Sequence, residues 1–318
     1  ALMNPIASLV LIRMNGGTAM MRILGIVGVQ ICICVPIIVF QFCKGKEFFS
    51  KEYWGYALRI GIPIVPHYLS GIILNQGDRI MIDKMVGKTE VALYGLAYSI
   101  GMLVQLFISG MNSALTPWMY SKIKKGDIRS MRKVLQLLSV VVVGIAVALM
   151  LISPELVLIF GSPKYREAVY VIPPVAASVF FIFIYNILSM PQFYYEKTQF
   201  LMAASMAAAG ANVVLNFIFI RLFGYIAAGY TTLACYMLYS VGHYIVSKRI
   251  LVNEGIQENL MSPGFLVACS VFLIGASIIC NLIFPYRILR YAILLASAGL
   301  VFWKKELLQK TMADIRKK

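Results

Sequence analysis

The chain alternates between long apolar stretches and short polar links. Runs such as 138–152 and 203–220 are continuous in apolar character. A helix of about twenty residues spans the hydrocarbon core of a bilayer, and it satisfies its own backbone hydrogen bonds there. The pattern therefore predicts an all-α fold, a polytopic transmembrane helix bundle.

The apolar pattern predicts about nine full spans and one partial helix. Arg13 interrupts the first run after about a dozen residues, which is too short to cross a bilayer. The chain also begins with Ala1 and lacks the basic leader of a signal peptide, so we expect a fragment whose N-terminal part is missing. The partial helix is expected near 1–12, and the spans near 22–43, 54–85, 91–120, 133–160, 168–191, 198–220, 224–247, 263–284 and 286–303.

Lysine and arginine gather in every second link between the predicted spans. Cytoplasmic links of membrane proteins carry an excess of these residues. The pattern therefore predicts a multi-pass protein of the cell inner (cytoplasmic) membrane with a cytoplasmic C-terminus. The basic links contain Lys44, Lys46 and Lys51; Lys122, Lys124, Lys125, Arg129, Arg132 and Lys133; Lys197; Lys248 and Arg249; and Lys304, Lys305, Lys310, Arg316, Lys317 and Lys318.

Composition narrows the functional classes. Apolar residues make up 60% of the 318, and charged residues only 13%. The formal net charge of +16 does not indicate nucleic-acid binding, because the basic residues lie at predicted helix ends beside lipid headgroups. The six cysteines lack metal-ligand spacing, and the chain has no P-loop and no G-x-S-x-G motif. We expect no metal, no cofactor, no catalytic residue and no enzyme activity.

Two sequence blocks resemble a known family. The block from Tyr56 to Ile100 is similar to the start of the C-terminal lobe of the polysaccharide flippases, the lipid-linked oligosaccharide branch of the multidrug/oligosaccharidyl-lipid/polysaccharide exporter superfamily. The block from Phe193 to Tyr244 resembles a later helix pair of that family, with E-K-T and N-x-x-x-N. The matching positions of the first block are Gly61, Pro63, Pro66, Asp78, Arg79, Val86, Gly87, Val91, Tyr94, Ala97 and Tyr98.

The resemblance implies a domain organisation and a task. Residues 1–48 would be the end of an N-terminal lobe, 49–255 a six-helix C-terminal lobe, and 256–318 two additional transmembrane helices with a basic cytoplasmic tail. The implied function is to move an undecaprenyl-diphosphate-linked oligosaccharide from the cytoplasmic to the outer leaflet by alternating access. The implied partners are a polyprenyl-diphosphate-linked glycan, membrane lipid, a glycan polymerase and glycosyltransferases.

The predicted span 54–85 carries most of the candidate substrate-binding residues. A charge inside a membrane costs roughly 3 kcal/mol on insertion scales, so it usually faces a cavity or a partner. Arginine binds phosphate oxygens in pairs through its planar fork, which suits Arg79 to a diphosphate. A second interpretation is an Arg79–Asp83 pair that only holds the helix. The candidates on this span are Asn75, Gln76, Asp78, Arg79 and Asp83.

Pro63, Pro66 and His67 are candidates for a hinge or for coupling. Proline removes a backbone donor and clashes with the preceding turn, so we expect a kink or a break in the span. His67 is a candidate for coupling transport to protons, because histidine can titrate near neutral pH. The alternative, which is the more common case for a lone histidine on an apolar helix, is a packed, hydrogen-bonded residue.

Neutral amides on other spans have two interpretations. Asn112 and Asn186 are candidates for binding sugar hydroxyls, but amides also tie membrane helices together at about 0.6–1 kcal/mol per bond. The same choice applies to Gln105, Gln192, Asn212 and Asn216.

Three other functions are alternatives. A drug-and-cation antiporter of the same superfamily would need buried acids that face its substrate. A membrane glycosyltransferase or polymerase would need a large outer loop with acid and base residues. The third alternative is a non-transporting membrane scaffold. The few deep acids disfavour the first, the short outer links disfavour the second, and the sequence does not exclude the third.

Overall fold

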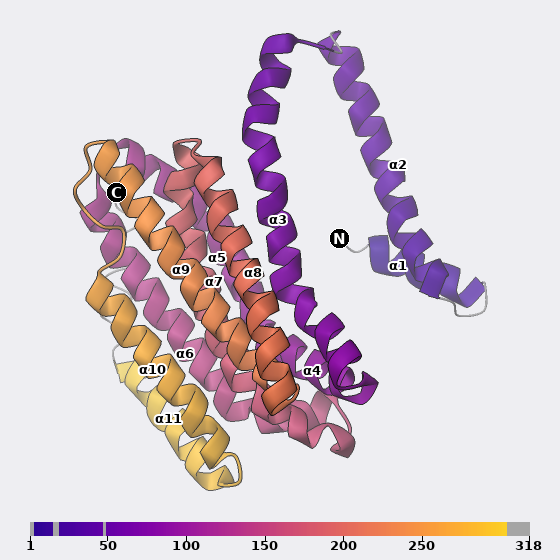
Figure 1. The fold of residues 1–318 in the computed structure, drawn as a ribbon, viewed down its shortest axis with the longest axis vertical. Helices are drawn as coiled ribbons and strands as arrows, with labels where there is room; N and C mark the ends of the chain where they lie inside the picture. The colour runs from indigo at the N-terminus through magenta and orange to yellow at the C-terminus, as the bar shows by residue number, and fades with distance from the viewer. Residues whose placement is uncertain (1–2, 15–18, 47–48, 304–318) are drawn as a thin grey trace. The chain divides into compact units, whose positions relative to one another are not determined.

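The computed structural model describes residues 3–14, 19–46 and 49–303. These residues form helices and no strand, which confirms the predicted all-α class. They fall into two compact units, one up to Arg59 and one from Ile60 onward (Figure 1). The helices are α1 (Met3–Met14), α2 (Ala19–Gly45), α3 (Lys51–Met85), α4 (Lys88–Gly101), α5 (Leu103–Lys124), α6 (Ile128–Phe160), the 3₁₀ segment η1 (Pro163–Val171), α7 (Ile172–Tyr194), α8 (Thr198–Phe223), α9 (Ala227–Asn253), α10 (Pro263–Ile283) and α11 (Arg287–Trp303).

In the first unit, α1 packs along α2. The Ser8 hydroxyl donates a hydrogen bond to the Arg22 carbonyl at 3.2 Å. Gly25 permits the close approach, because a Cβ at this position would lie 2.6 Å from the Ser8 Cα. The predicted partial helix is therefore a short helix held against the first full span.

The second unit is organised around α7, which packs against α4, α5, α6, α8, α9 and α10 (Figure 1). Pro173 and Pro174 begin this helix, where proline lacks only a donor that would have no helical partner. Every residue from Ile172 to Ile184 is buried. A helix that is apolar all round lies inside a bundle, and this explains the apolar sequence of α7.

The observed helices match most of the predicted spans within a few residues, but one span is broken. The predicted span 91–120 consists of α4 and α5, which meet at Met102 with a bend of 40°. Six described helices are long and apolar enough to cross a membrane, and the bent pair makes seven. This is fewer than nine, because α9 carries many hydroxyl side chains and α11 has only 17 residues.

The pair α10 and α11 packs on α6, and α10 also packs on α7. The connector before α10 buries Leu260 and Met261, and its Asn259 carbonyl accepts a hydrogen bond from Arg132 Nε at 2.6 Å. The pair therefore extends the core of the second unit. The domain boundaries at 48/49 and 255/256 stay predictions, and the basic tail from Lys304 to Lys318 lies outside the described residues.

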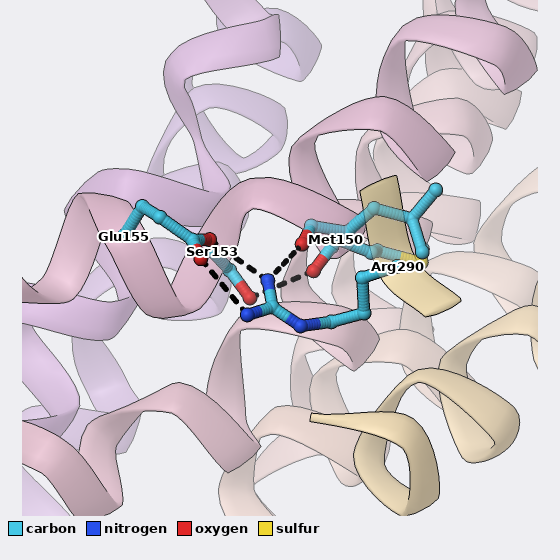
Figure 2. Close-up of polar contacts among 5 residues, drawn as sticks. Met150, Ser153, Glu155 and Arg290 are labelled. Carbon is cyan, nitrogen blue, oxygen red and sulfur yellow. Dashed lines mark hydrogen bonds and ion pairs between the residues drawn. The ribbon is translucent and has the colours of Figure 1, made fainter. Parts of the chain in front are cut away.

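Arg290 fastens α11 to the C-terminal turn of α6 (Figure 2). Its two terminal nitrogens each donate to one Glu155 oxygen at 2.8 Å, and Nη1 also donates to the Leu151 carbonyl at 2.7 Å. Pro154 leaves the Met150 carbonyl without its helical donor, and the Ser153 hydroxyl supplies one at 2.8 Å. Paired Arg–carboxylate bonds are strong and directional, so they fix α11 in one position.

The close packing at Gly101 predicts that alanine is destabilising at this position but not at Gly95 on the same helix. A Cβ at Gly101 would lie 2.6 Å from Val175 Cγ1 on α7, whereas a Cβ at Gly95 on the same helix would meet nothing within 4 Å. We expect Gly101→Ala to lower the free energy of unfolding by about 1–3 kcal/mol through overpacking. Thermal unfolding of the purified protein in detergent checks this, with Gly95→Ala as the control. Equal melting temperatures for the two variants would contradict the close contact of α4 with α7.

The Arg290–Glu155 pair predicts that the losses in the free energy of unfolding caused by substituting each residue are not additive. Arg290→Met leaves a carboxylate without its partner, and we expect a loss of about 2–3 kcal/mol. Breaking a fully buried ion pair costs about 3–5 kcal/mol. The expected loss is smaller here, because the Glu155 side chain is 24% exposed. Adding Glu155→Leu should recover much of the loss, because apolar residues that replace both partners are often tolerated. Additive losses in the double variant would argue against the pair.

Candidate functional site

The candidate site is built on the part of α3 that belongs to the second unit, from Ile60 to Met85. Successive residues of a helix point about 100° apart, so neighbours in sequence reach different surroundings. Asp78 is 0% exposed, whereas Arg79 is partly exposed and Ile80 is exposed. The three faces of α3 therefore have different environments.

The Asp78 carboxylate lies inside a hydrogen-bond network from three other helices. Tyr94 of α4 donates its hydroxyl to Asp78 Oδ2, Thr232 of α9 donates to the same oxygen at 2.7 Å, and Asn216 of α8 donates to Oδ1 at 2.6 Å. Asn216 also accepts from Thr231 and donates to Asn212 at 3.2 Å. A buried carboxylate costs much free energy unless it is hydrogen-bonded, and this network supplies three donors.

Asn75 lies one turn before Arg79 and holds the same helices together. Its Oδ1 accepts from Tyr98 of α4 at 2.6 Å and from Tyr236 of α9 at 3.3 Å, and its amide nitrogen donates to the Gly71 carbonyl at 2.8 Å. Both lone pairs of the oxygen are therefore used. Asn75 therefore orients Tyr98 and Tyr236, and its side-chain oxygen is not free to bind a ligand.

Arg79 lines an open groove of about 630 Å³, which we call the Arg79 groove. Nη1 of Arg79 donates to Gln76 Oε1 at 2.8 Å, and the guanidinium carbon lies 5.1 Å from the centre of the Tyr98 ring. In the described part of the chain Arg79 forms no ion pair, so the predicted alternative of an Arg79–Asp83 pair is not observed. The groove is lined by Tyr68, Gly71, Ile72, Asn75, Gln76, Arg79, Tyr98, Ser99, Met102 and Tyr185.

A second, smaller groove of about 170 Å³ lies beside the first, and we call it the tyrosine groove. His67 lies here, with Nδ1 3.1 Å from the Tyr239 hydroxyl and its ring edge-on to Phe193. Asn186, predicted from sequence as a sugar-binding amide, is also in its lining. The groove is lined by His67, Tyr68, Gly71, Leu74, Asn75, Tyr185, Asn186, Ser189, Phe193, Tyr236 and Tyr239.

Other predicted residues lie elsewhere. Asp83 is exposed on α3, and Asn112 is half-buried on α5; neither lines the two grooves. Pro63 and Pro66 lie inside α3, which continues through both as one helix, so the expected break does not occur. Their role as a hinge stays a prediction.

Several amides act between helices within the second unit. Asn212 and Asn216 are both 0% exposed in the Asp78 network. The Gln192 amide nitrogen lies 2.8 Å from His243 Nδ1 and so connects α7 with α9. The hydrogen bonds of these three residues agree with the interpretation that the amides hold neighbouring helices together.

Tyr185, Tyr236 and Tyr239 were not among the predicted site residues. Tyr185 lies nearly parallel to Tyr236, with ring centres 6.3 Å apart, and its ring centre is 4.5 Å from that of Tyr239. Tyr236 and Tyr239 lie three positions apart on one face of α9. This spacing could have indicated the groove from the sequence, because two tyrosine hydroxyl groups on one face of a membrane helix need hydrogen-bond partners or a cavity.

Comparisons with known proteins find similarity to a polysaccharide-biosynthesis family over part of the chain. Residues 2–124 match the family described as polysaccharide biosynthesis protein. The predicted resemblance is thereby confirmed at the level of that family; the block from Tyr56 to Ile100 lies within the match, and the block from Phe193 to Tyr244 lies outside it. No solved structure matches.

Two curated relatives come from Haemophilus influenzae. A protein named for the Lsg locus is 28% identical over 172 residues, which are 51% of this chain and 41% of the relative. An uncharacterized membrane protein is 29% identical over 167 residues, which are 49% of this chain and 40% of the relative. The match thus spans about two fifths of the length of these curated relatives. Together with the apolar helices, it identifies a multi-pass membrane protein.

The Asp78 network predicts that substitution of Asp78 lowers the stability of the protein much more than substitution of Asp83 on the same helix. Asp78→Ala leaves the Tyr94, Thr232 and Asn216 donors without their acceptor, and each unsatisfied buried group costs about 1–3 kcal/mol. We expect a loss on the order of 3 kcal/mol after partial rearrangement. Asp83→Ala on the exposed face should stay within about 0.5 kcal/mol of the wild type. Thermal unfolding in detergent measures both, and an unchanged melting temperature for Asp78→Ala would contradict a structural role of the network.

Proposed function

We propose that the chain is part of a membrane transporter that moves an undecaprenyl-diphosphate-linked oligosaccharide from the cytoplasmic to the outer leaflet. The family match over residues 2–124 supports an association with polysaccharide biosynthesis. The substrate, the direction of movement, the inner-membrane location and the cytoplasmic C-terminus are parts of this proposal. Transport would be non-enzymatic, by alternating exposure of a cavity between two lobes.

One observation carries the proposal. Arg79 presents its guanidinium to an open groove on a membrane helix, with an amide and an aromatic ring as its neighbours. Neither neighbour neutralises the positive charge. A charged side chain within a membrane segment is costly, so it is usually retained for a ligand or for a conducting path. The two oxygen-rich groups of a diphosphate match the fork of arginine.

The same geometry disfavours a cation antiporter. Such a transporter needs an acid that faces the substrate, but Asp78 is 0% exposed and lines neither groove. The charged group that the Arg79 groove offers is a cation, which attracts an anion. We therefore place the diphosphate at Arg79, with Gln76 beside it.

Arg79→Gln tests this proposal. A hydrogen bond to a charged group contributes about 1.5–3 kcal/mol, so loss of the guanidinium should lower export about ten- to hundredfold. The full-length protein is expressed in a host strain that lacks its own copy, and surface glycan and intracellular lipid-linked glycan are measured. Glycan should decrease at the surface and accumulate inside.

Arg221→Gln is the matched control, because Arg221 is exposed at the end of α8 and lies over Phe217 rather than in a groove. This variant should export glycan as the wild type does. Wild-type export by Arg79→Gln, at equal protein level in the membrane, would remove Arg79 from the mechanism.

A further inference from the structure

The tyrosine groove adjoins the Arg79 groove and differs from it in chemistry. The two grooves share Tyr68, Gly71, Asn75 and Tyr185, so they form one continuous depression. No lysine, arginine, aspartate or glutamate lines the tyrosine groove, and His67 is its titratable imidazole. A ligand that enters this groove from the Arg79 end therefore passes from a cationic region into a neutral one.

We propose that the tyrosine groove binds the first sugar ring next to the diphosphate and that it selects an uncharged ring. This inference rests on the proposed function, because it takes the diphosphate to lie at Arg79. Arg79 and Asn75 are four residues apart, which is about 6 Å along a helix. The groove thus begins within one sugar ring of the bound phosphates.

The lining offers both kinds of contact that a sugar ring requires. One side of a sugar ring carries C–H groups, and aromatic faces carry negative potential that attracts their partial positive charge. Tyr185 is the partly exposed ring of a cluster with Tyr236 and Tyr239, which are 3% and 4% exposed, so its face is the one that a sugar can reach. The ring edges of the sugar carry hydroxyl groups, which need donors and acceptors.

The amide group in this groove that is free to form hydrogen bonds is the Asn186 side chain. In the described part of the chain the Asn186 side-chain amide has no hydrogen-bond partner, although the neighbouring Ser189 hydroxyl is bonded to the Asn186 backbone carbonyl at 2.8 Å. Asn75, by contrast, has both lone pairs of its oxygen occupied. Asn186 is therefore the amide that can exchange hydrogen bonds with sugar hydroxyls.

The size of the groove limits what it holds. Sites for drug-sized ligands have volumes of about 300–1,000 Å³, and the tyrosine groove has about 170 Å³. It is large enough for one ring and too small for a branched oligosaccharide. Its contribution to selectivity is thus expected at the sugar attached directly to the diphosphate.

Two lipid probes separate this inference from the proposed function. The full-length protein, purified in lipid nanodiscs, is titrated with undecaprenyl diphosphate and with undecaprenyl diphosphate that carries one N-acetylglucosamine. Arg79→Gln should weaken the binding of both probes by similar factors, at least tenfold. Asn186→Leu should weaken only the sugar-bearing probe, by about three- to tenfold, as expected for the loss of one or two hydrogen bonds.

Ring contacts are tested at Tyr185. Tyr185→Ala should weaken only the sugar-bearing probe, while Tyr185→Phe, which keeps the ring, should recover most of the affinity. Tyr286→Ala is the control, because Tyr286 is exposed before α11 and outside both grooves. A third probe that carries one glucuronic acid should bind more weakly than the N-acetylglucosamine probe to the wild type.

The outcomes are distinguishable. If Asn186→Leu and Tyr185→Ala leave the sugar-bearing probe unaffected, or weaken both lipids equally, the sugar subsite is overturned while the diphosphate site stands. Tighter binding of the glucuronic acid probe would overturn the selection of an uncharged ring. If Arg79→Gln changes neither lipid, the proposed function itself fails.

Discussion

The position of α3 in the second unit depends on the hydrogen bonds that surround the Asp78 carboxylate. One face of this helix is exposed and apolar, with Tyr68, Ile72 and Ile80 all more than half exposed. The other face contacts α4, α8 and α9 through polar groups, because Tyr94, Asn216 and Thr232 all donate to one carboxylate. An acid buried without these donors would cost far more than the apolar contacts return. The network therefore decides which way α3 faces.

This constraint places Arg79 in its groove. Since Asp78 points into the bundle, the next residue is turned by about 100°, towards the boundary with the exposed face. Asn75, one turn earlier, is bonded to Tyr98 and Tyr236 and keeps the same rotation. Adjacent residues of opposite charge thus have separate tasks: Asp78 fixes the helix, and Arg79 is left with neutral neighbours. Without the Asp78 network, the direction of Arg79 would depend on the hydrogen bonds of Asn75 alone.

The sequence predicted the fold class, most spans and the location of the main candidates on one helix. Those features follow from local pattern, such as the run of apolar residues in α7 or the charges within α3. It did not predict the bend at Met102, because no local pattern of residues marks it. Beside the bend, Gly101 lies close to Val175, which is 74 positions away in the sequence. The sequence also does not reveal the structural role of Asp78, which was predicted to bind substrate. Its partners Asn216 and Thr232 lie 138 and 154 residues away, and only the packed helices bring them together. Tyr185 was missed because tyrosine is ordinary in membrane helices and its neighbours are set by α9.

Two arginines of the second unit show why only Arg79 is assigned a ligand. Arg290 is 3% exposed and binds both oxygens of Glu155, so its charge is compensated and both terminal nitrogens are bonded (Figure 2). A third group could bind there only by breaking that pair, which is strongly unfavourable in a low-dielectric interior. Arg79 has an amide and a ring instead, and it lies in a groove of about 630 Å³. Its charge has no carboxylate partner among the described residues, although Nε is buried and Nη1 is bonded to Gln76. The same residue type therefore fastens a helix at Arg290 and, in the proposed function, binds an anion at Arg79. The difference lies in whether a carboxylate is within reach.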